Sequence, residues 1–181
     1  MGYVYRPLSL LFLVVFMAGF ILNSVQVEAS DLKNSEPLRK SADLRFREVN
    51  NEIILDTKTN LMWLKRDYWQ MRGKWVNWFS AHEYIQKLNN KNFSGYADWR
   101  LPTLKEAETL YDRRKRNVDK DGDKIFIDSI FPKGAGWATW TSQDKKNKAI
   151  VVSFKNKGGR LFQDKISGTD AFVRLVRGPI K

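Results

Sequence analysis

The sequence predicts an α+β fold in which helices and strands occupy separate stretches of the chain. Short runs rich in β-branched and aromatic residues come first, two helical patterns fill the middle, and further strand-like runs occupy the last third. This order differs from the regular alternation of strands and helices that indicates a parallel sheet. We therefore expect a mainly antiparallel sheet accompanied by two helices.

Residues 1–29 have the pattern of a signal peptide. Arg6 precedes an apolar run from Leu8 to Leu22, and Val27-Glu28-Ala29 precedes a candidate cleavage point. The run is shorter than the roughly twenty residues that a membrane-spanning helix needs. We expect an exported protein, periplasmic or extracellular, that meets the membrane only through this segment if the segment stays uncleaved.

A polar segment of mixed charge, residues 30–50, separates the signal from the compact domain expected over residues 51–181. This segment contains Pro37 and little hydrophobic periodicity, which favours a flexible leader with a short helix over 42–49 as its one regular element. We therefore expect the 181 residues to comprise a signal peptide, a leader and one domain.

The domain is expected to open with a hairpin. Residues 52–56 and 61–64 are strand-like, and the polar residues between them form a turn. The basic and aromatic stretch that follows, Lys65–Trp75, has no clean period and contains Gly73. We therefore expect a loop there.

Two helices are expected next. Residues 77–89 place apolar side chains on one helical face, namely Trp78, Ala81, Ile85 and Leu88. The second helix opens at Thr103, which forms a capping box with Glu106, because each side chain can accept a hydrogen bond from the other residue's backbone N–H. Pro102 disfavours helix at the preceding residue.

The last third of the chain is expected to form strands. Residues 137–141, 149–154 and 160–163 are candidates, and a Gly-containing turn separates the second from the third. Residues 171–177 alternate apolar and basic side chains, which is typical of a half-exposed strand.

Composition excludes several classes of enzyme. The chain has no cysteine and one histidine, so disulfides, thiol nucleophiles and cysteine-ligated metals are ruled out, and His82 is the only histidine for a catalytic triad. It lacks a neighbouring Gly-x-Ser-x-Gly motif, which favours a structural histidine. The formal charge of +12 favours anionic partners, with no specific nucleic acid expected for an exported chain.

Four motifs occur in the order found in a known family: 56–63 (DTKTNLMW), 98–106 (DWRLPTLKE), 140–142 (WTS) and 173–177 (VRLVR). They resemble the DUF1566 family, also called the Lcl C-terminal domain, over about residues 51–178. The cysteine that the family carries near its first helix is absent. The resemblance implies an exported bacterial protein with a C-type-lectin-like fold and adhesin-like binding, since the namesake member binds sulfated glycosaminoglycans.

The signature residues are interpreted as structural. Trp99 and Leu101 are expected to be buried, and Arg100 is expected to pair with Asp98 or Glu106 and to bond backbone carbonyls. The complete structural set is Asp98, Trp99, Arg100, Leu101, Pro102, Thr103 and Glu106, with Trp63 and Trp140 in the core.

Candidate ligand-binding residues combine aromatic rings with positive charge. An exposed indole can stack on a sugar ring, and a neighbouring cation can pair with a sulfate or carboxylate. The candidates are Trp69, Trp75, Trp137, Arg113, Arg114, Lys115 and Arg116, with further support from Lys145, Lys146, Lys148, Lys155, Lys157 and Arg160. The alternatives are core packing for the tryptophans and a solvated helix end for the basic run.

Alternating carboxylates suggest a calcium loop at Asp119, Asp121 and Asp123, with Asp128 further along. The glycine and the twelfth residue do not fit an EF-hand, so a plain turn is the alternative reading. Calcium is the only cofactor that the sequence suggests.

These observations favour an exported, non-catalytic binding protein that contacts an acidic or sulfated polysaccharide through a basic and aromatic surface. One alternative is a cell-envelope module that binds an acidic protein, because aromatic residues and arginine are enriched in such interfaces. Another is an envelope hydrolase that uses paired carboxylates, which need only meet in space.

Overall fold

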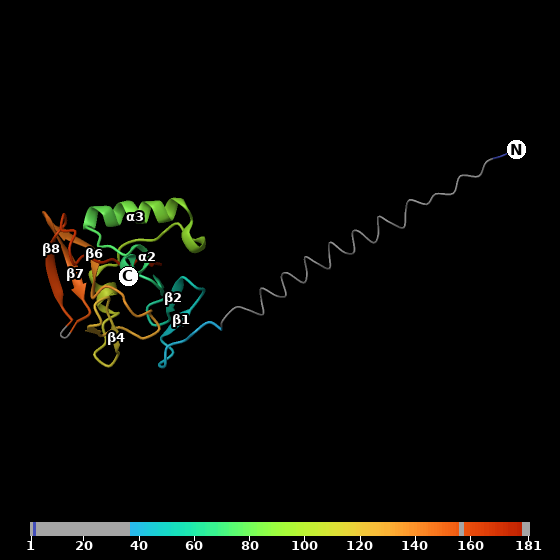
Figure 1. Ribbon diagram of the computed structural model, residues 1–181, viewed down its shortest axis with the longest axis horizontal. Coiled ribbons are helices and arrows are strands. Elements are labelled where there is room, and N and C mark those ends of the chain that lie inside the picture. The colour runs from blue at the N-terminus through green and yellow to red at the C-terminus, as the bar shows by residue number, and fades with distance from the viewer. Residues whose placement is uncertain (1, 3–36, 156–157, 179–181) are drawn as a thin grey trace. The chain divides into compact units, whose positions relative to one another are not determined.

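The computed structural model describes Gly2, residues 37–155 and residues 158–178. The chain divides into two units, 1–37 and 38–181, and the second holds the elements in Figure 1. Apart from Gly2, the expected signal peptide lies outside the described residues, as do leader residues 30–36. Among the residues described, none of the helices has both the length and the apolar character needed to span a membrane.

The first sheet contains the expected hairpin and one strand that the sequence did not predict. Its order is β1 (Phe46–Glu48), β2 (Ile53–Asp56), β3 (Leu61–Leu64) and β9 (Val176–Arg177), and all neighbours are antiparallel. The prediction of a leader as far as residue 50 is therefore wrong, as is the helix over 42–49. Phe46 explains the difference, because its buried ring packs edge-on against Phe131 with centroids 5.4 Å apart.

The second sheet is antiparallel and agrees with three of the expected strands. It consists of β6 (Ala138–Lys145), β7 (Lys148–Ser153) and β8 (Arg160–Asp164), with a register shift in β6 between Trp140 and Asp144. A two-stranded ribbon, β4 (Asn117–Val118) and β5 (Lys124–Ile125), occupies part of the charged stretch before it. Figure 1 shows the two larger sheets toward opposite ends of the domain.

A short helix, α2 (Tyr68–Arg72), replaces the loop predicted over 65–75. Asp67 caps it, accepting a hydrogen bond from the backbone of Gln70, whose side chain accepts one from the backbone of Asp67 in return. Gly73 ends the helix in the left-handed region at φ 67°. Capping interactions set the limits of this five-residue helix, and none of its residues is buried, so a search for hydrophobic periodicity does not detect it.

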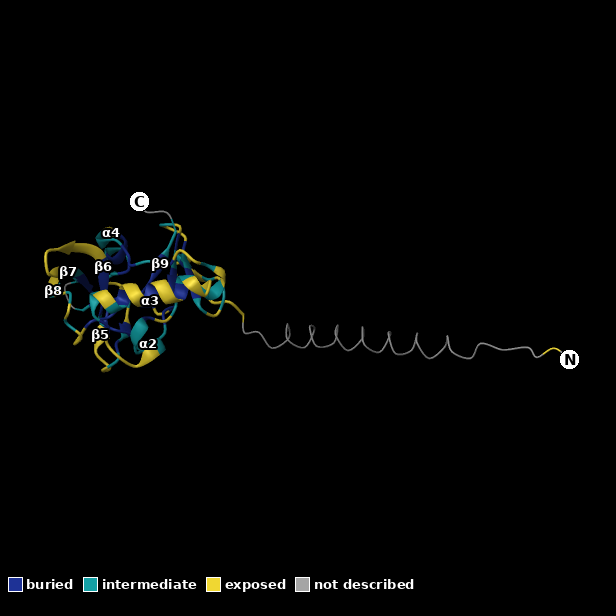
Figure 2. Ribbon diagram, turned by 90° about the horizontal axis from the view of Figure 1, so that it is seen from above, coloured by how far each residue is buried: buried dark blue, intermediate teal, exposed yellow. Residues whose placement is uncertain are grey.

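The two expected helices are present. In α3 (Trp78–Asn90), Asn77 caps the first turn, and the buried side chains are Ala81, Tyr84, Ile85 and Leu88. Figure 2 shows buried and exposed stretches alternating along this helix. The capping box of Thr103 and Glu106 is confirmed in α4 (Leu104–Glu108). A short 3₁₀ helix, η1 (Phe93–Gly95), follows α3.

The carboxy-terminal segment differs from the half-exposed strand that was predicted. Residues 171–176 are all buried, and only the last two residues before Gly178 form a strand. Backbone bonds from Trp140 to Phe172, from Tyr68 to Val173 and from Leu64 to Leu175 hold the segment between other elements. The alternation of apolar and basic residues was misleading because Arg174 is buried. Its guanidinium donates to the carbonyls of Leu64 and Lys65.

Two clusters of buried apolar side chains form the core of the domain. One includes α3, parts of β6 and β7, and the carboxy-terminal segment, and the other includes β2, β3, β5 and the region around Phe131. Trp63, Trp99 and Trp140 are at most 1% exposed, as predicted. The core therefore uses these three of the seven tryptophans and leaves the others closer to the surface.

Candidate functional site

The signature motif joins α4 to the end of the chain. Arg100 forms a two-pronged ion pair with Glu106, with nitrogen–oxygen distances of 2.7 and 2.8 Å, and it also donates to the carbonyls of Leu101 and Gly178. Backbone bonds in both directions link Arg100 to Val176. The pairing of Arg100 with Glu106 and its carbonyl bonds are thus confirmed.

Electrostatics within the motif support this structural role. Burial alone would raise the pKa of Glu106, but hydrogen bonds from Arg100 and Thr103 hold that pKa below its usual value. Asp98 takes no part in the pair and instead accepts from Arg177 at 2.7 Å. The motif therefore holds α4 against residues 176–178 of the carboxy-terminal segment.

Two of the three tryptophans proposed for ligand binding, Trp69 and Trp137, pack against Phe172, and the third, Trp75, packs against Trp69. The rings of Trp69 and Trp137 are 6.3 and 6.1 Å from the ring of Phe172, measured between centroids. Trp75 stands 5.6 Å from Trp69 and is 39% exposed, whereas the other two indoles are half-buried. We call Trp69, Trp75 and Trp137 the tryptophan cluster. The helix α2 and the turn at Gly73 bring its first two members together.

Two lysines lie against the tryptophan cluster. The Lys120 ammonium is 4.8 Å from the centroid of Trp69 and 5.4 Å from that of Trp75, and the Lys155 ammonium is 5.7 Å from that of Trp137. Such contacts are cation–π interactions. Lys155 was among the supporting cations, but Lys120 was missed because it lies inside the predicted calcium loop.

The candidate calcium ligands form ion pairs with these lysines. Lys155 lies 3.2 Å from Asp119 and 2.8 Å from Asp123, and Lys120 lies 2.7 Å from Asp121. One oxygen of Asp119 also accepts the backbone N–H groups of Asp121 and Asp123, which shapes the turn.

Asp128 is held elsewhere, by Lys115 at 2.7 Å. Within residues 37–155 and 158–178, no three histidine or acidic side chains are grouped so as to hold a metal ion. The arrangement instead places an acidic loop beside the tryptophan cluster, with its carboxylates neutralised by lysine.

The basic run Arg113–Arg116 does not act as a unit. The helix α4 ends at Glu108, so the run lies in the turn before β4 and is not a helix end. Lys115 faces inward between Asp43 and Asp128, at 2.6 and 2.7 Å. Arg116 lies 4.9 Å from the ring centroid of Phe126. The run is therefore divided between structural and outward-facing side chains.

Arg113, Arg114 and Arg116 are the exposed members of the run. Arg114 pairs with Asp112 at 2.8 Å while its own side chain is 87% exposed, and its hydrogen bonds lower the pKa of Asp112 to about 2. Arg114 also lines a surface hollow of about 430 Å³ with Arg45, Lys58, Thr57 and Thr109 among its other walls.

The remaining candidates are dispersed. Lys145, Lys146 and Lys148 are exposed around the β6–β7 turn, Arg160 pairs with Glu108 at 2.5 Å, and Lys157 lies outside the described residues. His82 is exposed on α3 with its ring 4.1 Å from that of Trp78, and partial burial lowers its pKa. The described contacts thus connect the tryptophans with Lys120 and Lys155 but place the arginine run on other partners.

Fold and surface together define a small α+β domain with two larger antiparallel sheets, a two-stranded ribbon and a basic, aromatic surface region. A family model, described as the Lcl C-terminal domain, matches residues 52–177. The chain belongs to the Lcl C-terminal domain family. No curated protein and no solved structure matches it significantly.

Proposed function

We propose that this chain is an exported, non-catalytic binding protein whose C-type-lectin-like domain contacts an acidic or sulfated polysaccharide through the tryptophan cluster and its lysines. The observation that carries the proposal is the exposed indole of Trp75 beside Trp69, with the ammonium of Lys120 against both rings. This arrangement combines an apolar face and a positive charge within a few ångströms.

The chemistry of an acidic sugar matches both parts of this surface. The apolar face of a pyranose ring can lie on an indole, and its sulfate or carboxylate can accept hydrogen bonds from an ammonium group. Phe172 packs against two of the three indoles, which limits the side-chain entropy lost when a ligand binds. The surface is thus partly preorganised.

Additional lysines enlarge the positive surface. Lys74 precedes Trp75 and is exposed. Lys133 is also exposed, and its backbone carbonyl accepts a hydrogen bond from the side chain of Gln70 in α2. Neither lysine has an acidic partner in the part of the chain that the structure describes. The Lys120 side chain is 11% exposed and pairs with Asp121, which is 56% exposed, so a ligand anion has to compete with Asp121 for this lysine.

The test is binding to immobilised heparin and to a desulfated control polysaccharide at increasing salt. We expect Trp75→Ala to weaken heparin binding by about tenfold, because one aromatic stacking platform is worth on the order of 1–3 kcal/mol by analogy with base stacking. Phe79→Ser is the matched control, since Phe79 is another exposed aromatic residue, on α3. Equal binding by wild type and Trp75→Ala would contradict the proposal.

A further inference from the structure

The turn between β6 and β7 concentrates positive charge. Lys145 and Lys148 are direct cross-strand partners, and Lys146 occupies the turn with φ 55°. We call these three residues the lysine tip. None of them forms an ion pair within the described residues, although Asp164 stands opposite Lys148 in β8 and accepts from Asn147. Like charges that face each other across a hairpin are unfavourable unless an external anion neutralises them.

Apolar side chains are exposed beside the lysine tip. Phe79 is 50% exposed and Ile166 is 78% exposed, the highest value among the large hydrophobic residues that the structure describes. Together with Lys146 and Lys165 they line a hollow of about 270 Å³. Phe162 on the edge strand β8 is 59% exposed as well. This end of the domain therefore exposes apolar and positive groups together.

We propose that the lysine tip, with Phe79 and Ile166, docks the domain on an anionic lipid membrane. The ammonium groups would lie among the lipid phosphates, and the two apolar side chains would enter the boundary between headgroups and acyl chains. Transfer of isoleucine and phenylalanine side chains from water into an apolar medium is favourable in free energy, and a sulfated polysaccharide provides no such medium.

The kind of cation also distinguishes a membrane from a protein partner. Protein interfaces are enriched in arginine and depleted in lysine. The described charged groups around the hollow are lysines and the acids Asp144 and Asp164, with Lys165 paired to Asp144. Flexible lysines suit a fluid surface of phosphates, since they neutralise charge without a fixed two-pronged geometry.

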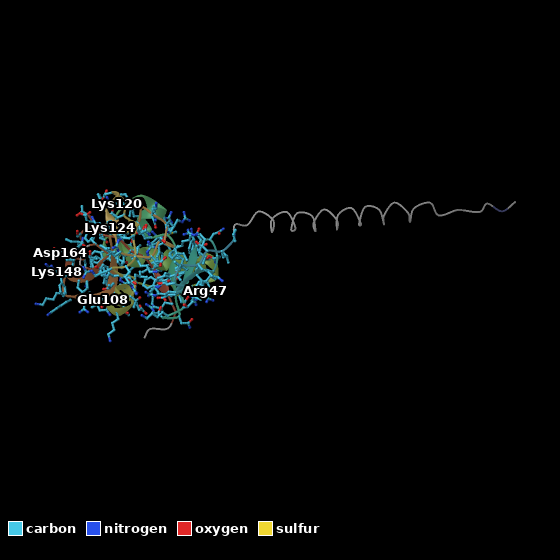
Figure 3. All side chains as sticks on the ribbon, turned by 90° about the horizontal axis from the view of Figure 1, so that it is seen from below. Arg47, Glu108, Lys120, Lys124, Lys148 and Asp164 are labelled. Atoms are coloured by element: carbon cyan, nitrogen blue, oxygen red, sulfur yellow. The ribbon has the colours of Figure 1, made fainter. Side chains whose placement is uncertain are left out.

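The lysine tip is separate from the tryptophan cluster. Figure 3 shows Lys148 and Asp164 at one edge of the domain and Lys120 at another. The membrane proposal therefore does not depend on polysaccharide binding, and different substitutions can test the two.

The experiment measures co-sedimentation of the full chain with vesicles of phosphatidylcholine alone or with phosphatidylglycerol. We expect binding to the anionic vesicles, and K145S/K146S/K148S should weaken it on the order of a hundredfold, from about fivefold per lysine. The double variant F79S/I166S should weaken it about tenfold while heparin binding stays unchanged. Comparing variants and lipid compositions cancels any contribution from residues 1–29.

The matched control is K87S/K91S/K105S, which removes the same charge from exposed, unpaired lysines of the described chain. It should retain anionic-vesicle binding within about threefold. If both triple variants lose binding equally, binding depends on the net charge of the domain and not on the lysine tip, which would overturn the proposal. Absence of binding to anionic vesicles would overturn it as well. Full retention of binding by F79S/I166S would overturn the apolar contact.

Discussion

Arg174 shows how a single residue can support several elements. Its buried guanidinium donates to two carbonyls at the end of β3, those of Leu64 and Lys65, and lies 4.6 Å from the ring centroid of Phe131. Burial raises the pKa of Asp67, while the charge of Arg174 and the backbone bonds of Gln70 and Gly136 oppose that rise. The arginine thus connects the carboxy-terminal segment with the cap of α2.

Replacing Arg174 by leucine should therefore destabilise the domain by about 3 kcal/mol, since the carbonyls and the buried Asp67 lose a compensating charge. Urea unfolding measures this change. Arg174→Lys should recover little of it, because one ammonium cannot reproduce the planar, multidentate donor. Stability equal to wild type in either variant would show that the guanidinium has no such role.

Gly136 provides a second test at the residue scale. A Cβ atom there would lie 2.2 Å from the ring of Phe172, whereas one at Gly168 would meet nothing within 4 Å. Gly136→Ala should displace Phe172, cost about 1–3 kcal/mol in unfolding free energy, and weaken heparin binding by disturbing the tryptophan cluster. Gly168→Ala is the control and should change neither property.

At the scale of elements, local signals predicted much of the fold. The hairpin of β2 and β3, the apolar face of α3 and the capping box of α4 follow from patterns within a few residues. Strand β1 and helix α2 were missed because their stability depends on one buried ring and on a polar cap. Arg174 made the last segment look half-exposed, because sequence alone does not show which carbonyls a buried arginine will meet.

The motif around α4 should make stability depend on pH. Because the pKa of Glu106 is lower in the folded than in the unfolded chain, folding binds fewer protons there, and stability is lost as pH falls below about 4. Asp112 acts in the same direction and Asp67 in the opposite one.

Glu106→Gln should be less stable than wild type at pH 7 but should lose less stability between pH 5 and pH 3. Thermal unfolding across this range measures the effect, and Lys105→Gln on the exposed side of α4 is the control. If the stability of Glu106→Gln and of wild type changed with pH in parallel, the ionised Glu106 would not be stabilised by its pairing with Arg100.

At the scale of the whole molecule, tertiary contacts decide which predicted site residues can act together. The tryptophans were predicted as candidates, and the structure brings Trp69 and Trp137 onto Phe172, with Trp75 against Trp69. The run Arg113–Arg116, in contrast, is divided when Lys115 turns inward to Asp43 and Asp128. Lys120 joins the site only because a turn folds back toward α2. Such long-range contacts have no signature in a single sequence.

The central proposal is that the tryptophan cluster contacts an acidic glycan, and the indole N–H signals in a ¹⁵N spectrum test it most directly. Titration with a defined sulfated oligosaccharide should shift the signal of Trp75, identified by its absence in Trp75→Ala. The buried indoles of Trp99 and Trp140, which donate to backbone carbonyls, should stay in place. An unshifted Trp75 signal at saturating oligosaccharide would contradict the account.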